Sequence, residues 1–293
     1  MSAASPGVTV TFAGSGDAFG SGGRDQACIH LRGGDGGPVL LDCGATSLPA
    51  LRRCGLDPGE IAAVFVSHLH GDHFGGLPFL ILDGQFTRRI GPLAVAGPPG
   101  TDRRLTEAME CLFPGSSTVR RRFPVEVTEL DPGAAQTVAG VQVTAWLADH
   151  LSGAPALALR LGLAGRSIAY TGDTAWTDAL IELADGADLL IAEAYRMDQV
   201  IPYHLRVADL TAHRASLRCS RIIVTHMGPD VLAQQDRLTF EPAHDGLVQL
   251  ITNSWGVAGC SLLWLCGFGG GVLAWVACEV ACVLGVGVVL PFP

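Results

Sequence analysis

The strongest constraint on the fold of this 293-residue chain is a run of metal-ligand side chains placed directly after an apolar segment. Residues 61–66 are β-branched, aromatic or small, which is typical of a buried strand. The polar run follows at once and reads Ser67, His68, Leu69, His70, Gly71, Asp72 and His73. In an extended segment His68 and His70 share a face, and a turn at the glycine can direct Asp72 and His73 to a neighbouring point. We interpret the run as a site for two metal ions; a surface loop rich in histidine by chance is the alternative.

The H-x-H-x-D-H pattern of residues 68–73 resembles the signature of the metallo-β-lactamase superfamily. The resemblance extends over roughly residues 8–251. It implies an α/β fold, a four-layer αββα sandwich of two mixed β-sheets flanked by helices. It also implies that further ligands come from distant parts of the chain.

Four later strand patterns each end at a histidine or an acid. His150 closely follows residues 136–148, Asp173 follows residues 166–170, Glu193 follows residues 187–192, and His226 follows residues 221–225. Ligands at the ends of neighbouring strands can converge on one edge of a sheet. Singly, His150 could be an ordinary hydrogen-bonded histidine and Asp173 the N-cap of a helix over residues 175–184.

The resemblance assigns these residues to two metal ions. One ion would be held by His68, His70, His150 and Asp173, and the other by Asp72, His73, Asp173 and His226, with Asp173 bridging. Imidazole and carboxylate ligands without thiolate suit zinc, and manganese or iron also fit. Two divalent ions close together lower the pKa of a bridging water and present it as hydroxide. We therefore expect a dinuclear metal-dependent hydrolase.

The surroundings of the ligands favour one branch of the superfamily. Lactamases typically have cysteine where this chain has Asp173, and thioesterases resembling glyoxalase II carry Pro-Gly-His-Thr at the third histidine, where residues 148–152 read Ala-Asp-His-Leu-Ser. The context is more similar to ribonuclease Z and the cyclic phosphodiesterases. We expect a phosphodiesterase. An ester or thioester hydrolase of the same fold and a non-catalytic, membrane-tethered metal-binding protein are the alternatives.

The resemblance to ribonuclease Z also implies an auxiliary histidine. His204 lies 22 residues before His226, separated from it by a helix pattern over residues 205–219 and a strand pattern over residues 221–225. We expect His204, oriented by Glu193, to assist departure of the leaving group, with Asp72 as the third catalytic residue. A core or capping histidine is the alternative.

Other segments complete the expected domain. Residues 14–23 form a glycine-rich loop that lacks the lysine of a phosphate-binding loop and has no helix pattern after it, so we expect a tight turn near the site. The expected strands are residues 8–13, 27–31, 39–42 and 92–96, and the expected helices are residues 45–54, 74–86 and 101–112. Residues 123–130, 136–148 and 155–163 are predicted to be consecutive antiparallel strands.

Charge bears on the substrate. The net charge is −9, and all 19 basic residues are arginine, so the chain is a poor general nucleic-acid binder. Seven arginines between His73 and His150 form either an anion-binding patch or a solvated face. Only 23 positions separate His150 from Asp173, which leaves no room for the long basic arm of tRNA-processing relatives. We expect a small phosphodiester or nucleotide-like substrate, with RNA and a homo-oligomer left open.

The two ends of the chain differ in character. The N-terminus lacks a signal-peptide pattern, and the nine cysteines form no CxxC pair, so we expect reduced thiols and a cytoplasmic protein. We place a hydrolase domain at residues 1–252 and an apolar, glycine-rich tail at residues 253–293. Residues 255–293 contain Glu279 as their single charge. A membrane anchor, an accidental extension in a shifted reading frame, and a packing element are the alternatives.

Overall fold

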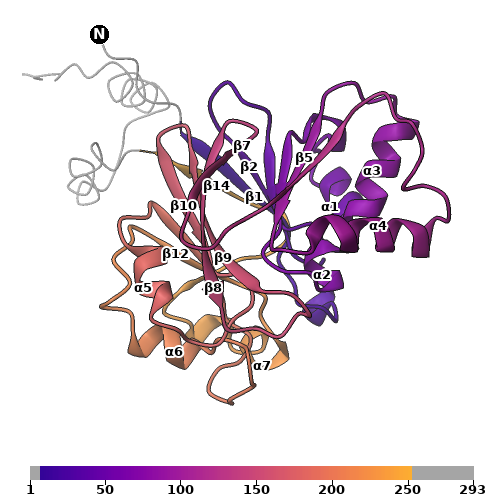
Figure 1. Ribbon diagram of the computed structural model, residues 1–293. Coiled ribbons are helices and arrows are strands. Elements are labelled where there is room, and N and C mark those ends of the chain that lie inside the picture. Colours follow the sequence, from indigo (N-terminus) through magenta and orange to yellow (C-terminus); the bar gives the residue numbers. More distant parts are fainter. Residues whose placement is uncertain (1–6, 253–293) are drawn as a thin grey trace, which may run out of the picture. The chain divides into compact units, whose positions relative to one another are not determined.

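Two β-sheets of seven strands each face one another in the computed structural model, which describes residues 7–252 (Figure 1). The first sheet has the order β14-β1-β2-β3-β4-β5-β6. Its strands are β1 (Val8–Gly14), β2 (Cys28–Arg32), β3 (Val39–Leu41), β4 (Ala63–Phe65), β5 (Leu93–Gly97), β6 (Val125–Glu129) and β14 (Leu247–Ile251). The second sheet has the order β13-β12-β11-β10-β9-β8-β7. Its strands are β7 (Ala135–Val138), β8 (Val141–Ala148), β9 (Ala156–Leu163), β10 (Arg166–Tyr170), β11 (Leu189–Glu193), β12 (Ile222–Thr225) and β13 (Glu241–Pro242).

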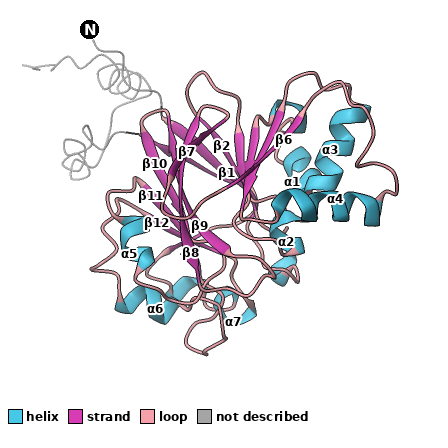
Figure 2. Ribbon diagram, viewed as in Figure 1, coloured by secondary structure: helices cyan, strands magenta, loops and turns pink. Residues whose placement is uncertain are grey.

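Helices lie on the two outer sides of the pair of sheets (Figure 2). The helices before the second sheet are α1 (Ser47–Arg53), α2 (Gly71–Phe74), α3 (Leu77–Phe86) and α4 (Thr101–Leu112). The later ones are α5 (Ala179–Ala184), α6 (Val207–Ala212) and α7 (Pro229–Leu232). Short 3-10 turns occur at η1 (Ser21–Gly23), η2 (Pro58–Glu60) and η3 (Gln235–Arg237).

Side-chain alternation along the strands divides the core into three layers. Phe12 and Ile191 belong to the cluster between the two sheets. Val64 packs in a second cluster with residues of α1, α3 and α4, and Val224 in a third with residues of α5 and α6. Because successive side chains point to opposite faces of a strand, one apolar run can fill two layers. The predicted αββα sandwich of two mixed sheets is confirmed.

Each sheet is half antiparallel and half parallel, and this arrangement determines where the ligands lie. Strands β3, β4, β5 and β6 run parallel in the first sheet, and β10, β11, β12 and β13 run parallel in the second. Parallel strands end at the same edge of a sheet. The segments that follow β4, β10, β11 and β12 therefore gather at one end of the sandwich.

The prediction of three consecutive antiparallel strands is correct for the last two, because β8 pairs antiparallel with β9, and wrong for the first. Residues 123–130 do contain β6, but β6 pairs in parallel with β5 in the first sheet, not with its successors. The reason is that α4 forms a crossover between β5 and β6, a connection that parallel neighbours require. Residues 136–148 are also not one strand. Ala139 and Gly140 both have positive φ, +48° and +79°, and they form the two-residue turn between β7 and β8.

Three predicted helices are shorter than expected. Residues 74–86 contain the end of α2 and then α3, residues 175–184 contain only α5, and residues 205–219 contain only α6. Asp178 precedes α5 as its N-cap residue, so Asp173 is not the cap of that helix.

The predictions for residues 253–293 lie outside the described residues. Within residues 7–252, none of the helices combines the length and hydrophobicity needed to cross a bilayer.

Candidate metal centre

The motif after β4 is divided by the start of a helix. His68 and His70 precede α2, and Asp72 and His73 lie in its single turn, which begins at Gly71. The backbone therefore changes from extended to helical between the two pairs. As the sequence predicts, the two pairs enter two different groups of possible metal ligands.

The first group joins the two sheets through three histidines. The nitrogen atoms of His68, His70 and His150 lie within 4.8 Å of one another. His70 Nδ1 and His150 Nε2 are 3.0 Å apart. His150 follows β8 in the second sheet, whereas His68 and His70 follow β4 in the first. Three imidazole nitrogens at this spacing are suited to a transition-metal ion.

The second group consists of Asp72, His73, Asp173 and His226. His73 Nε2 lies 3.3 Å from Asp72 Oδ2 and 3.3 Å from Asp173 Oδ1. His226 Nε2 lies 3.2 Å from Asp72 Oδ2 and 3.6 Å from Asp173 Oδ2. The structure brings Asp173 to this second group, and its predicted bridge to the first group stays a prediction.

A glycine allows the two ligand-bearing loops to meet. Gly172 has a φ of +56°, and a Cβ atom there would lie 2.8 Å from Cβ of Ser67. That separation is far below an ordinary van der Waals contact. Only glycine therefore lets the loop that carries Asp173 approach the loop that carries His68.

Neighbouring groups fix the orientation of the histidine rings. His73 Nδ1–H donates to Asp42 Oδ2 at 2.6 Å, and His150 Nδ1–H donates to the Tyr203 carbonyl at 2.9 Å. Both bonds turn the Nε2 side of the ring toward the other ligand groups, as in metal sites where a partner holds the other ring nitrogen. Asp42 was not predicted as a site residue.

Asp42 connects both sheets to the site. It is fully buried, has a φ of +59°, and accepts hydrogen bonds from the Ser67 hydroxyl and the Tyr170 hydroxyl at 2.8 Å each. Asp42 directly follows β3 and so shows the same sequence signal as the predicted ligands, an apolar strand ending at an acid. Its role depends on contacts with β10, which no local pattern indicates.

Buried atoms without partners show that the cluster fits a cation. Among the described residues, His68 Nε2 and Asp173 Oδ1 are buried and make no hydrogen bond. Such atoms are costly unless a ligand completes them. Burial alone would raise the pKa of Asp72, but His73 and His226 outweigh it and hold that pKa well below its usual range. Carboxylates and imidazoles thus require a shared positive charge, which protons or metal ions can supply.

His204 and Glu193 form a hydrogen-bonded pair beside the second group. His204 Nδ1–H donates to Glu193 Oε1, and Glu193 Oε2 accepts the backbone N–H groups of Thr174 and Leu205 at 3.0 and 3.1 Å. Burial lowers the pKa of His204, but the bond to Glu193 outweighs it and raises that pKa above its usual value. By distance, His204 and Glu193 could also join Asp173 and His226 around an ion. The mutual bond, however, already uses one ligand atom of each.

The clusters open into a small cavity of about 200 Å³. Six predicted site residues line it, His70, Asp72, His150, Asp173, His204 and His226. Ala18, Phe19 and Tyr195 complete the lining. Ala18 and Phe19 belong to the glycine-rich loop of residues 14–23, which the sequence predicted to lie near the site.

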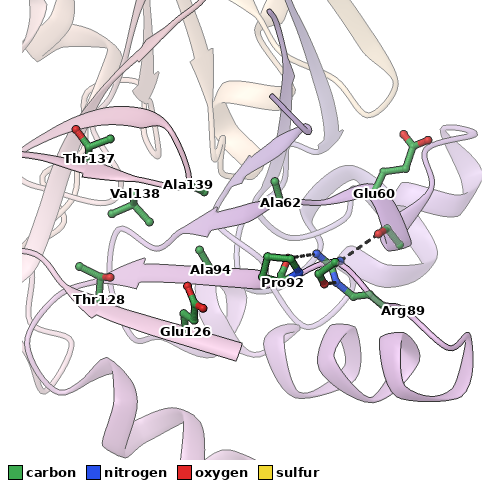
Figure 3. A pocket seen from close by; sticks show the side chains of 12 residues that line it. Glu60, Ala62, Arg89, Pro92, Ala94, Glu126, Thr128, Thr137, Val138 and Ala139 are labelled. Atoms are coloured by element: carbon green, nitrogen blue, oxygen red, sulfur yellow. Dashed lines mark hydrogen bonds between the residues drawn. The ribbon is translucent and has the colours of Figure 1, made fainter. Parts of the chain in front are cut away.

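A larger hollow of about 540 Å³ lies elsewhere, at the ends where β4, β5 and β6 begin (Figure 3). Arg89 points into its wall and donates hydrogen bonds to the backbone carbonyls of Gly59, Gly91 and Pro92. Its guanidinium is thus bound to the protein itself. The hollow contains none of the predicted site residues, so we assign the site to the smaller cavity.

Four of the seven arginines between His73 and His150 are engaged by other groups of the protein. Arg89 is buried, Arg103 and Arg104 both pair with Glu107 on α4, and Arg121 donates to the Ser116 carbonyl. The arrangement agrees with the alternative of a mainly solvated face.

Comparisons with known proteins identify the family to which the chain is similar. A family model described as a beta-lactamase superfamily domain matches residues 38–227. Ribonuclease Z of Mycobacterium sp. (strain KMS) is 30% identical over 253 residues, covering 78% of this chain and 87% of the relative. Ribonuclease Z of Mycobacterium marinum is 26% identical over 250 residues, covering 78% and 89%.

Two solved structures extend the comparison. Human tRNase Z, short form, has a TM-score of 0.66 and 27% identity, covering 83% of this chain and 99% of the other. A diphosphatase from the PhnP family has a TM-score of 0.67 and 21% identity, covering 83% and 97%. The diphosphatase likeness is evidence for the fold alone.

Proposed function

The chain belongs to the beta-lactamase superfamily and is a metal-dependent hydrolase, and from this premise we propose that it is a dinuclear phosphodiesterase of the ribonuclease Z type. The proposed ligands are His68, His70, His150 and Asp173 for one ion and Asp72, His73, Asp173 and His226 for the other. We propose zinc because the set contains imidazole and carboxylate without thiolate. When bound, two such ions would supply Lewis acidity and activate a water for attack on phosphorus.

The single observation that carries the proposal is the pair formed by His204 and Glu193 at the wall of the metal cavity. The hydrogen bond from His204 Nδ1–H to Glu193 leaves Nε2 of that ring for a substrate atom. Burial lowers the pKa of His204, but the contact with Glu193 outweighs it, so the ring holds its proton more strongly than a free imidazole does. A protonated imidazole can give that proton to a departing alkoxide and stabilise the charged phosphoryl group.

The size and charge of the site favour a small phosphodiester over a folded RNA. The cavity of about 200 Å³ is below the roughly 300–1,000 Å³ of sites that enclose a drug-sized ligand. The chain is acidic, and arginines such as Arg89, Arg103 and Arg104 are engaged by other groups of the protein. The two ribonuclease Z relatives act, by their names, on RNA, so RNA is the substrate to compare in the same assay.

Replacing His204 by alanine tests the proposal. The variant should keep its metal content and lose about 10²- to 10⁴-fold in kcat on a phosphodiester with an alkyl leaving group. The loss should be smaller with an acidic phenol, which departs without a proton. His213→Ala, at the end of α6, is the matched control and should change neither value. Wild-type kcat in His204→Ala on the alkyl substrate would contradict the proposal.

A further inference from the structure

Phe19 has an unusual position for an apolar side chain. It lines the metal cavity, yet 83% of its surface is exposed. Exposing an aromatic ring to water is unfavourable in free energy. Single exposed apolar residues are common on protein surfaces, so exposure alone assigns no role. The position beside the ligands and the rigidity of the surrounding loop distinguish this residue.

The backbone around Phe19 is held in place from inside the protein. Asp17 is 1% exposed, and its Oδ1 accepts the N–H groups of Phe19 and Ser21 at 3.2 and 2.9 Å. Its Oδ2 accepts the Ser21 hydroxyl at 2.6 Å. Gln26 Nε2 donates to the Ala18 carbonyl at 3.1 Å. The ring is therefore presented to solvent by a fixed backbone.

The ring also has free faces. Among the described residues, no aromatic or cationic side chain packs against the Phe19 ring, and the residues after it are Gly20, Ser21, Gly22 and Gly23. Tyr195, the other carbocyclic ring of the cavity, is engaged: its centroid lies 4.7 Å from that of His204, and the Arg196 guanidinium lies 4.7 Å from it. Phe19 is the ring at this cavity that can receive a flat group.

We propose that Phe19 is a stacking platform for the nucleobase of a nucleotide phosphodiester substrate. This inference rests on the proposed function, because it takes the phosphodiester group to lie at the metal cavity. A cavity of about 200 Å³ cannot enclose a whole nucleotide, so the nucleoside extends past the rim, where the ring stands. Stacking of a base on an aromatic side chain is worth about 1–3 kcal/mol, roughly 5- to 150-fold in affinity.

Two synthetic substrates with the same leaving group isolate the platform. Thymidine 5′-(4-nitrophenyl phosphate) carries a base, and methyl 4-nitrophenyl phosphate does not. Both release 4-nitrophenolate, so the ratio of their kcat/KM values reports on the thymidine arm. In the metal-loaded full chain, Phe19→Ala should lower this ratio about 5- to 100-fold, and Phe19→Trp should retain it. Phe19→Leu, apolar but not flat, should behave like the alanine variant.

The chain offers a matched control in Phe86, at the end of α3. Phe86 is 80% exposed but does not line the metal cavity. Phe86→Ala should leave the ratio unchanged. An unchanged ratio in Phe19→Ala overturns the platform, while wild-type turnover of the methyl substrate still supports the phosphodiesterase.

A binding measurement keeps the two proposals separable if neither substrate is hydrolysed. Titration calorimetry with thymidine 5′-monophosphate and with methyl phosphate gives the same comparison without turnover. The platform is supported if wild type binds the nucleotide more tightly than methyl phosphate and if the affinity for the nucleotide falls about 5- to 100-fold in Phe19→Ala. This result would support the platform even where the catalytic proposal fails. Equal affinity of wild type and variant for the nucleotide overturns it.

Discussion

The two ends of the sandwich handle buried polar groups in opposite ways. At the end where β4, β5 and β6 begin, the Arg89 guanidinium donates to backbone carbonyls that include those of Gly59, Gly91 and Pro92. At the end where β4, β10 and β12 finish, His68 Nε2 and Asp173 Oδ1 are buried and make no hydrogen bond. We call the end around Arg89 complete because this guanidinium is bound by the protein itself, and the end around the metal ligands incomplete because these two ligand atoms have no hydrogen bond.

The presence or absence of hydrogen-bond partners for buried polar atoms distinguishes a structural polar residue from a ligand site more clearly than the size of a cavity does. The larger hollow is at the complete end, about 540 Å³ against about 200 Å³. Unpaired atoms of several residues that converge on one point are the more informative feature, because burying them uncompensated costs free energy. The predictions below test this contrast, from the largest expected effect to the smallest.

Asp173→Ala should remove one of the proposed metal ligands at the incomplete end. We expect metal affinity to fall by at least about 10²-fold, since loss of even an indirect partner of a metal ligand costs 10–100-fold, and phosphodiester turnover to fall with it. The metal content of purified protein, measured by elemental analysis, should drop from near two ions per chain. Asp131→Ala, an exposed aspartate between β6 and β7, is the control. Full occupancy in Asp173→Ala would refute the dinuclear assignment.

Arg89→Met should damage the complete end without affecting the other. The buried carbonyls would lose their donor, and we expect the free energy of unfolding to fall by about 2–4 kcal/mol. Metal content should be unchanged. Arg88→Ala, its exposed neighbour, should change stability by less than about 0.5 kcal/mol. Loss of metal in Arg89→Met at temperatures where it is folded would mean that the two ends are coupled.

His30 tests whether one buried atom without a hydrogen bond is enough to indicate a ligand site, because His30 belongs to neither group of metal ligands. Its buried Nδ1 has no hydrogen-bond partner among the described residues, and burial, assisted by Arg32, lowers the pKa of His30 to about 4. The unfolded chain, with a pKa near 6.5, binds this proton more readily, so stability falls as pH drops from 6.5 toward 4. Urea unfolding in the presence of chelator should show wild type losing about 2–3 kcal/mol more than His30→Leu between pH 7 and pH 4.5.

The same substitution tests what an isolated unpaired atom means. His30→Leu should leave the metal content at its wild-type value, because no other ligand group converges on that nitrogen. A loss of metal there would show that an unpaired atom in one histidine is enough to mark a ligand.

Glu193→Gln should shift a pH profile with little effect on metal content. The pKa of His204 is raised by Glu193, so the acid form in the wild type persists above pH 6.5, and activity should decline only as pH rises through the raised pKa. The neutral amide removes the charge, moves this basic limb to lower pH, and should reduce turnover about tenfold at pH 8, with a smaller loss at pH 6. Superimposable profiles would exclude His204 as the proton donor.

The local part of this site could be predicted from sequence, and its supporting groups could not. His150, Asp173 and His226 each come directly or closely after an apolar strand, a signal contained within a few residues. Asp42 shows the same signal, but its importance lies in bonds to Ser67 and Tyr170, residues 25 and 128 positions away. Support of this kind becomes visible only when both sheets are in place.

Strand partners and helix ends were the weaker part of the prediction for a similar reason. The strand pattern of β6 is local, whereas its partner β5 is chosen by the crossover through α4. Helix α6 ends at Ala212 although an apolar pattern continues, and the next residue, His213, stacks on Trp176 with ring centroids 3.8 Å apart. The end of α6 thus coincides with a contact between His213 and Trp176, which lies before α5, and the sequence pattern of α6 does not indicate this contact.

The origin of the ligands from both sheets has a consequence for folding kinetics. His68 follows a strand of the first sheet and His226 a strand of the second, so the metal cluster exists only after loops of more than a hundred residues have closed. Contacts of such long sequence separation form slowly. Metal should therefore bind late in refolding and, once bound, hold the sheets together, because unfolding must release the ions. The metal-loaded enzyme should resist unfolding chiefly through a slow unfolding rate, which chelators would increase.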